Sequence, residues 1–387
     1  MTFKIIGPDD PALAAARKNI AEHPEWNLEL TVYPWADYRD VMMESLSADN
    51  SPNQAVFVPG HVWIPELAAA GLITELDPLL SDLPSATRGD YYWENVVKAV
   101  RTESQYLDSQ YMIPYFNDAH ILFYREDLVE LQKTDDLLEI SPLDLVGLAE
   151  KAHQPPDIYG IALKAHPSEI LFDWMPYLLA AGGQIADSDL LPAFRSEAGI
   201  QALKAYLKLR DFAPPQTGSF GNEEIADIIK NGQAAFVTTW GGQAAPIFLD
   251  ENNLFREKYH PAIFPYPCGG TWGIALPSSQ SREIQLKTLQ ILLLLNSPEA
   301  DKDVLLAAGS PVREDSYTET AYQKYAWLRT QREVYERISF LPFDPRISVF
   351  LGPLTENLVS AFEGKISPED ALDIAHDQIM EALKNIT

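Results

Sequence analysis

Segments with the pattern of β-strands alternate with segments that have the pattern of α-helices through the first 71 residues of the chain. The strand-like segments are short and rich in apolar residues, whereas the helix-like segments carry apolar residues every three or four positions. The expected strands are residues 3–7, 28–35 and 54–60, and the expected helices are residues 12–22, 36–48 and 64–71. This alternation predicts βαβ units, and therefore an α/β fold with a largely parallel sheet covered by helices on both faces.

The remainder of the chain contains fewer expected strands and more expected helices. Residues 110–130 read as two extended pieces, interrupted at residues 114–118 and followed by a helix start, with a helical region continuing to residue 155. A helix from residue 170 should end at Gly182 and Gly183, since glycine readily ends helices. The other expected elements are strands at 159–163, 234–240 and 269–279, helices at 197–212 and 283–298, and a mostly helical stretch at 316–387.

A chain of 387 residues is too long for one ordinary domain, so two lobes are expected. With 46% hydrophobic and 22% charged residues, the composition is that of a soluble globular protein. The most apolar run, residues 286–295, falls well short of the roughly 18 residues that a membrane span requires. The formal charge of −27 disfavours nucleic acid or an anionic membrane surface as a partner.

Several chemical classes lack their usual sequence support. The single cysteine, Cys268, excludes an intrachain disulfide. The P-loop, GxGxxG, GxSxG and HExxH motifs are missing, and the seven histidines are scattered, so neither a metal site nor another cofactor is predicted. The chain opens on a strand-like segment without the regions of a signal peptide, so it is either cytoplasmic or begins at the mature end of an exported protein.

Four tryptophans stand at or near the ends of expected strands. They are Trp35, Trp63, Trp240 and Trp272. Ligands of open α/β sheets bind beyond the carboxyl ends of the strands. A sugar ring has apolar C–H faces that suit a flat aromatic platform, and Trp63 is predicted to form part of one at the mouth of a cleft. Packing is the better explanation for any one of these tryptophans alone, since tryptophan is usually buried, whereas their shared placement favours a ligand site.

Polar side chains in the expected loops beside these aromatic residues provide partners for hydroxyl groups. They are Asp9, Asn117, Asp118 and Asp173. Each also suits a helix cap or a turn. Asp118 is favoured because it follows a proline-interrupted strand at an expected crossover between lobes. Arg313 could reach a hydroxyl or a carboxylate, with a surface arginine as the alternative.

Five segments together resemble the extracellular solute-binding proteins of ABC importers, specifically the carbohydrate-binding branch that includes maltose-binding protein. They occur in the order typical of that family and cover nearly the whole chain, at residues 63–80, 111–128, 223–242, 307–315 and 356–373. The resemblance implies a periplasmic-binding-protein-like fold of type II, with two α/β lobes joined by hinge strands. It further implies a ligand held in a cleft between the lobes and delivered to a membrane permease.

Position by position, the resemblance assigns ligand contacts to Trp35, Trp63, Asp118 and an aromatic cluster at Phe172, Asp173 and Trp174. The family often has Gly-x-Trp after the strand at 234–240, whereas this chain has Trp240, Gly241 and Gly242. The stacking role of Trp240 therefore stays open. Leu351 stands near a position where maltose-binding relatives carry an aromatic residue, so a malto-oligosaccharide ligand is not implied.

The sequence thus predicts a monomeric, non-enzymatic binding component of an ABC importer that captures a mono- or oligosaccharide in the periplasm or outside the cell. The expected lobes are residues 1–117 with 262–310, and residues 118–261 with 311–387. One alternative is the same fold with a polyamine, iron or anion as its solute. Another is a glycoside hydrolase, which would need two carboxyl groups about 5 to 10 Å apart.

Overall fold

A computed structural model describes residues 2–131, 137–339 and 341–385 of the chain. The chain divides into two compact units. Unit 1 comprises Met1–Asp118, Gly270–Lys324 and Phe343–Pro345, and unit 2 comprises Ala119–Gly269, Tyr325–Pro342 and Arg346–Thr387. The first crossing lies one residue beyond the expected boundary at 117. The return to unit 1 falls at Gly270 instead of 262, and residues 311–324 lie in unit 1.

Unit 1 contains a mixed sheet. Its strand order is β2 (Leu28–Tyr33), β1 (Phe3–Pro8), β3 (Ala55–Pro59) and β11 (Gly269–Ala275), followed by the first part of β6 (Ile113–Arg125). β1 pairs in parallel with β2 and β3, whereas β11 runs antiparallel to β3. The expectation of a largely parallel sheet is therefore wrong, because the strand after β3 comes from a distant segment and not from another βα repeat.

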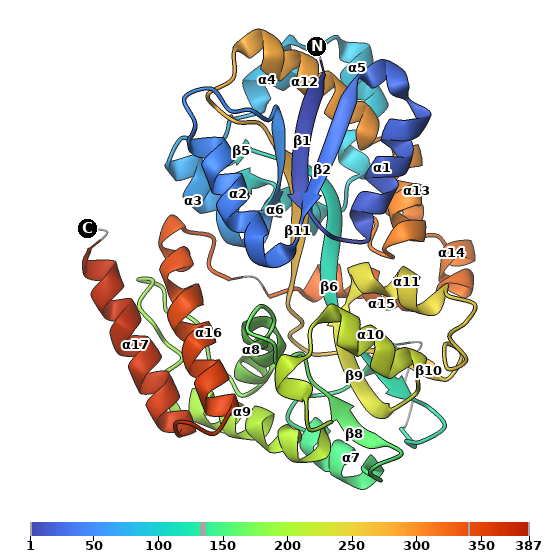
Figure 1. Cartoon of the computed structure of the whole chain (residues 1–387), viewed down its shortest axis with the longest axis vertical. Helices are drawn as coiled ribbons and strands as arrows, with labels where there is room; N and C mark the ends of the chain where they lie inside the picture. The colour runs from blue at the N-terminus through green and yellow to red at the C-terminus, as the bar shows by residue number, and fades with distance from the viewer. Residues whose placement is uncertain (1, 132–136, 340, 386–387) are drawn as a thin grey trace. The chain divides into compact units, whose positions relative to one another are not determined.

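Three helices follow the three parallel strands of unit 1 in turn (Figure 1). They are α1 (Ala12–Glu22), α2 (Trp35–Ser47) and α3 (Gly60–Ala69). The bounds of α1 are those predicted. β2 ends at Tyr33, so Trp35 begins a helix and does not end a strand, and α3 starts at Gly60, so Trp63 lies inside it. The other helices of unit 1 include α6 (Lys98–Glu103), α12 (Arg282–Leu295) and α13 (Pro298–Ala307).

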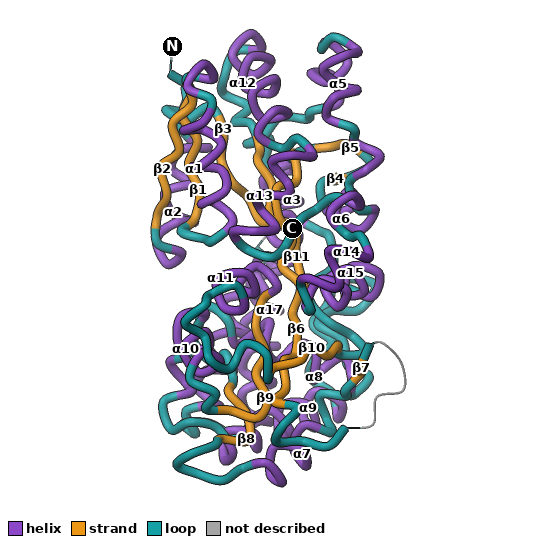
Figure 2. Tube along the Cα trace, turned by 90° about the vertical axis from the view of Figure 1, so that its right-hand side faces the viewer, coloured by secondary structure: helices purple, strands orange, loops and turns teal. Residues whose placement is uncertain are grey.

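The sheet of unit 2 is also mixed, and Figure 2 shows its strands in orange. Its order is β8 (Tyr159–Ala162), β9 (Ala234–Trp240), the second part of β6, β10 (Tyr259–Ile263) and β7 (Leu138–Glu139). β8 is parallel to β9 and β10 to β7, whereas β6 is antiparallel to both β9 and β10. β9 has the predicted bounds.

The helices of unit 2 enclose a large apolar core that includes the fully buried Trp174. They include α7 (Leu145–Ala152), α8 (Ile170–Ala180), α9 (Glu197–Leu209), α10 (Asn222–Lys230), α15 (Trp327–Arg337), α16 (Ser348–Phe362) and α17 (Pro368–Lys384). α16 and α17 run side by side (Figure 1). Gly182 follows α8 with φ of 82°, in the left-handed region that only glycine adopts freely, which agrees with its predicted role as a helix terminator.

Two predictions around β6 are wrong. β6 is one continuous strand over 13 residues and is not interrupted at 114–118. Arg125 is followed by a turn, the described residues 126–131 and 137–144 contain no helix, and α7 begins at Leu145. Residues 132–136 of the expected helical region lie outside the described residues. None of the helices in the described part of the chain has the length and hydrophobicity of a membrane-spanning segment.

Candidate functional site

Three of the four tryptophans singled out in the sequence meet in unit 1. Trp35 starts α2 directly after β2, Trp63 lies in α3 directly after β3, and Trp272 lies in β11. The rings of Trp35 and Trp63 stack, with centroids 5.8 Å apart and planes at 14°. Trp272 meets both edge-on, at 5.5 Å from Trp35 and 6.5 Å from Trp63. We call these three residues the tryptophan cluster.

Exposure differs sharply within the tryptophan cluster. Trp35 is 39% exposed, whereas Trp63 is 6% and Trp272 is 8% exposed. Phe116, which is fully buried, stacks on Trp272 at 5.7 Å and supports it from below. Trp35 is therefore the most exposed ring of the tryptophan cluster, whereas Trp63, which the sequence had favoured as a platform, is almost covered.

One charged group contacts the tryptophan cluster, and another lies at the same end of the sheet. The Arg39 guanidinium lies 5.6 Å from the centroid of the Trp63 ring and pairs with Glu66 at 3.3 Å. The exposed Asp9 lies at the same sheet edge, because its backbone N–H donates to the carbonyl of Tyr33 at 2.8 Å. Arg39 was not among the predicted site residues, because its contact is with Trp63 of another helix and no local spacing indicates it.

Asp10 was also missed by the sequence analysis. Burial raises the pKa of the Asp10 carboxyl to about 7. The negative charge of Asp9 also raises this pKa, whereas the hydrogen bond from the backbone N–H of Ala12 lowers it. Asp9 and Asp10 therefore form a carboxyl pair in which one member takes up a proton near neutral pH. Such a pair can both donate and accept hydrogen bonds at the carboxyl end of β1.

A buried polar chain lies beside the tryptophan cluster. Asn117 Nδ2 donates to Thr271 Oγ1 at 2.7 Å, and the backbone N–H and the hydroxyl of Thr271 donate to Glu103 Oε2 at 2.7 and 2.6 Å. Burial raises the pKa of the Glu103 carboxyl to about 8. Because Thr271 directly precedes Trp272, this chain fixes the strand that carries the ring. Asn117 is buried in it, while Asp118 is part-exposed.

Arg313 and Trp174 are predicted site residues whose side chains lie in the interior. Arg313 is 1% exposed, lies 4.9 Å from the centroid of the Tyr91 ring, and donates to the carbonyls of Asn296 and Tyr92 at 2.5 and 3.1 Å. Trp174 belongs to the core of unit 2. Both side chains are occupied with protein contacts, so we leave them out of the set that we propose to contact a ligand.

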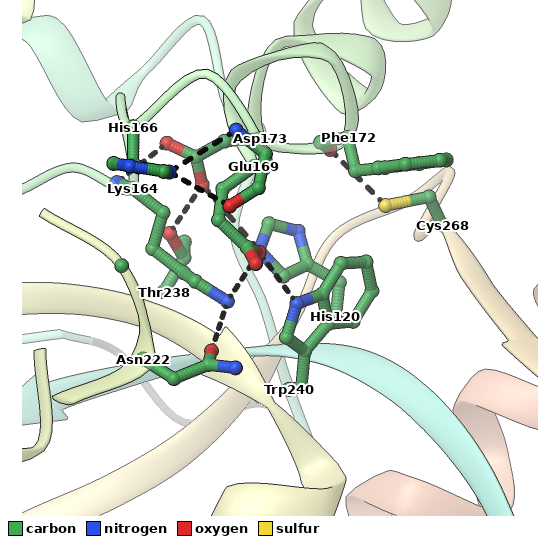
Figure 3. Close-up of polar contacts among 12 residues, drawn as sticks. His120, Lys164, His166, Glu169, Phe172, Asp173, Asn222, Thr238, Trp240 and Cys268 are labelled. Carbon is green, nitrogen blue, oxygen red and sulfur yellow. Dashed lines mark hydrogen bonds and ion pairs between the residues drawn. The ribbon is translucent and has the colours of Figure 1, made fainter. Parts of the chain in front are cut away.

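Trp240, the fourth tryptophan, belongs to unit 2 and has its own neighbours. Its indole N–H donates to Glu169 Oε2 at 2.8 Å (Figure 3). The His120 ring lies 4.9 Å from the Trp240 ring, and the Phe172 ring meets it edge-on at 6.0 Å. The Lys164 ammonium lies 4.9 Å from the centroid of the same ring. Protein groups therefore hold the indole on several sides, which argues against a freely stacking Trp240.

A buried ion pair accompanies Trp240. Lys164, which is 1% exposed, bonds through Nζ to Glu169 Oε2 at 2.8 Å and to Asn222 Oδ1 at 2.6 Å. Lys164 stands two residues after the end of the buried strand β8, and Asn222 begins α10. The sequence analysis missed all three residues. A lysine placed beyond a buried strand, with a glutamate five residues later, was the signal that could have found them.

Asp173 is a buried carboxylate that holds several elements of unit 2 together. It accepts hydrogen bonds from Thr238 Oγ1 at 2.6 Å, Tyr206 Oη at 2.8 Å and the backbone N–H of Lys164 at 3.0 Å, and it lies 3.4 Å from His120 Nε2. Burial raises the pKa of Asp173, but the hydrogen bonds and the attraction of His120 outweigh it and lower the pKa below its ordinary value. The contacts of this carboxylate in the structure are thus made with other groups of the protein.

Gly241 is buried where β9 ends. A Cβ at this position would lie 1.8 Å from Gln331 Oε1 of α15, so a larger residue requires the Gln331 side chain to move. This close approach explains the glycine after Trp240. Within the described residues, no three His, Cys, Asp or Glu side chains gather closely enough to hold a metal ion.

Comparison with known proteins agrees with this architecture. The model of a family described as bacterial extracellular solute-binding protein matches residues 8–326. An ABC transporter solute-binding protein from Agrobacterium radiobacter, solved with ribitol, has a TM-score of 0.88 at 20% identity, covering 99% of this chain and 98% of that chain. Maltose-bound MalE3 of T. maritima gives 0.84 at 17% identity, with 98% and 99% covered. These likenesses confirm the predicted fold class.

A third solved structure and one curated relative extend the comparison. A solute-binding protein from Agrobacterium vitis with bound D-mannitol has a TM-score of 0.84 at 15% identity, covering 100% of this chain and 99% of that chain. The probable amino-acid ABC transporter periplasmic-binding protein of Sinorhizobium fredii is 26% identical over 162 residues, which are 40% of this chain. The match spans 36% of the length of that relative.

Proposed function

Because the chain belongs to the bacterial extracellular solute-binding protein family, we propose that it captures a sugar or a polyol for an ABC importer. The observation that carries this proposal is the tryptophan cluster, in which one exposed indole ring is held in place by two covered ones. A fixed, flat apolar surface of this kind suits the C–H face of a carbohydrate. The ligands in the ribitol, maltose and D-mannitol complexes of similar folds support the same solute class.

The polar groups around the cluster complement the hydroxyl groups of such a solute. Asp9 and Asp10 can accept and donate hydrogen bonds, and Arg39 donates them. We include Trp35, Asp9, Asp10, Arg39 and Asp118 in the proposed contact set of unit 1. From unit 2 we include Phe172 and Trp240, which are part-exposed and whose rings are held in a fixed orientation by their contact with each other.

The proposed activity is binding without chemical change. Members of this family bind solutes, and the proposal therefore gives the carboxyl groups the role of hydrogen-bond partners and not of acids or nucleophiles. We propose that the protein acts outside the cytoplasm as a monomer, and that the partner that receives the solute is a membrane permease. The large negative charge favours solubility in that setting and repels anionic lipid.

An amino acid is the second candidate solute. The name of the relative from Sinorhizobium fredii favours it, since that protein is described as part of an amino-acid transporter. An amino acid carries an ammonium and a carboxylate, so it requires an accessible charged group of each sign. Arg39 and Asp9 are exposed groups of this kind in unit 1.

A thermal-shift screen against sugars, polyols and amino acids tests the proposal. A ligand at 100 times its dissociation constant stabilises the folded state by about 2.7 kcal/mol, which gives a measurable rise in the unfolding midpoint. We expect at least one sugar or polyol to give this rise and to be recovered intact after incubation. A rise with amino acids alone would favour the second candidate, and a cleaved sugar would indicate a hydrolase.

A further inference from the structure

Lys164 of unit 2 places a buried ammonium among three different groups that attract cations. The Glu169 carboxylate lies 2.8 Å from Nζ, the Asn222 amide oxygen lies 2.6 Å from it, and the centroid of the Trp240 ring lies 4.9 Å from it. An ammonium has three N–H groups. Two of them can donate to the two oxygens (Figure 3), and the third can then face the aromatic ring.

A carboxylate, an amide oxygen and an indole face are together the chemistry of a cation-binding site. Here the occupant is tethered, since it is the end of the protein's own side chain. Glu169 Oε2 also accepts the indole N–H of Trp240 at 2.8 Å, so the same oxygen fixes both the cation and the ring. The nearby Asp173 is held by its own hydrogen bonds and by His120, and it makes no contact with the Lys164 ammonium.

We propose that Lys164 is a specificity-determining residue whose ammonium fills a cation site made by Glu169, Asn222 and Trp240 and so excludes cationic solutes from this wall of unit 2. Such exclusion matters in a protein with a formal charge of −27, because its field concentrates cations near the surface. Once cationic solutes are excluded, the solutes still admitted are neutral sugars and polyols, and this part of the inference rests on the proposed function. The cation site itself rests only on the contacts of Lys164.

The test removes the tethered cation and offers a free one. Lys164→Ala deletes three carbons and the ammonium, which together match n-propylammonium. We expect calorimetric titration with n-propylammonium to show binding to Lys164→Ala about tenfold or more tighter than to the wild type, since a desolvated cation on an aromatic face adds to the carboxylate contact. The unfolding midpoint should rise with the amine, whereas 1-propanol, which lacks the charge, should have no such effect.

Spectroscopy and control variants locate the effect. The indole N–H resonance of Trp240, assigned with Trp240→Phe, should shift in Lys164→Ala and return toward its wild-type position with n-propylammonium. Lys204→Ala removes an exposed lysine of unit 2 that pairs with Glu369, and it should not respond to the amine. If Lys164→Ala does not fold alone, refolding with the amine or with the alcohol replaces the titration, and only the amine should yield folded protein.

Equal effects of amine and alcohol, or no effect of either, would overturn the cation site. Binding of n-propylammonium to the wild type as tightly as to Lys164→Ala would overturn the exclusion of cationic solutes. A parallel titration of the wild type with ribitol, D-mannitol and maltose separates this inference from the proposed function. Amine rescue without any sugar or polyol binding would retain the cation site and reject both the proposed solute class and the selectivity drawn from it.

Discussion

Within the tryptophan cluster, exposure separates the ring that a ligand can reach from the rings that support it. Trp35 presents 39% of its surface, while Trp63 lies against its inner face and is almost covered. Substitutions at the two positions should therefore have different consequences. A change at Trp35 should act on ligand affinity, and a change at Trp63 should act first on the stability of unit 1.

We expect Trp63→Ala to lower the free energy of unfolding by about 3 to 5 kcal/mol, because it leaves a large cavity beneath Trp35. Trp35→Ala should cost much less, since its ring is partly in water already. Urea unfolding of both variants checks this, with Trp26→Ala as a control for a tryptophan of unit 1 that stacks on His23. Equal losses at Trp35 and Trp63 would contradict the assignment.

Glu103 gives unit 1 a pH dependence whose sign follows from its raised pKa. The folded protein holds a proton on Glu103 up to about pH 8, whereas the unfolded chain releases it near the ordinary value of 4.5. The folded state therefore binds more protons in this range, and its stability falls as pH rises, at up to about 1.4 kcal/mol per pH unit. Asp10 and Asp301, with pKa values raised to about 7 and about 6, act in the same direction.

Glu103→Gln, which cannot titrate, should lose less stability than the wild type between pH 5 and pH 8. Chemical unfolding at several pH values measures the difference. Identical slopes for the two proteins would show that Glu103 is ionised in the folded state. Any dependence of the unfolding free energy on pH that remains in Glu103→Gln is tested by adding the substitution Asp301→Asn.

At the residue scale, the sequence singled out four tryptophans, of which three meet in unit 1, but it did not indicate what covers them. Trp35 and Trp63 follow neighbouring parallel strands, so their proximity follows from the βαβ pattern. Which ring stays exposed depends on Trp272, which comes from β11, a segment far away in the chain. Likewise, the burial of Arg313 depends on carbonyls of Asn296 and Tyr92, which no local pattern indicates.

At the scale of elements, the join between β9 and α15 is the tightest near the candidate site. Gly241→Ala would place a methyl group 1.8 Å from Gln331 Oε1. We expect a loss of about 1 to 3 kcal/mol in unfolding free energy, as for other overpacked cores. The double variant Gly241→Ala/Gln331→Ala should recover part of this loss, because it removes the obstructing amide.

Gly147→Ala is the matched control, since Gly147 lies in α7 and a Cβ there meets nothing within 4 Å. It should leave unit 2 as stable as before or stabilise it by about 0.5 to 1 kcal/mol. Thermal unfolding of the three variants compares them. If Gly241→Ala behaved like Gly147→Ala, the close approach to α15 would be refuted.

Elements with a clear local pattern were predictable, and elements set by distant pairing were not. α1 and β9 have the predicted bounds, because periodicity and glycine positions specify them. Pro114 was taken as a strand break, but it is the second residue of β6, where a missing N–H is tolerated. The apolar spacing after Arg125 suggested a helix, yet Leu138 and Glu139 pair with β10 as β7.

At the scale of the whole molecule, the order of the elements and the matched family were accessible from the sequence. The residues that we propose to contact a solute were less accessible, because they are spread over loops and strand ends of separate segments. The formal charge of −27 belongs to the same scale. Its sign disfavours polyanionic partners, while in our proposal the choice between neutral and cationic solutes depends on a few buried groups such as Lys164 and Glu169.

Isothermal titration calorimetry with the sugar or polyol that gives the largest thermal shift tests the central claim most directly. The wild type and Trp26→Ala should bind that solute with similar affinity. Trp35→Ala should bind it about threefold to tenfold more weakly, since stacking on one ring contributes about 0.5 to 1.5 kcal/mol. Unchanged affinity in Trp35→Ala, or a wild-type protein that binds no sugar or polyol, would contradict the claim that this exposed indole receives a polyhydroxylated solute.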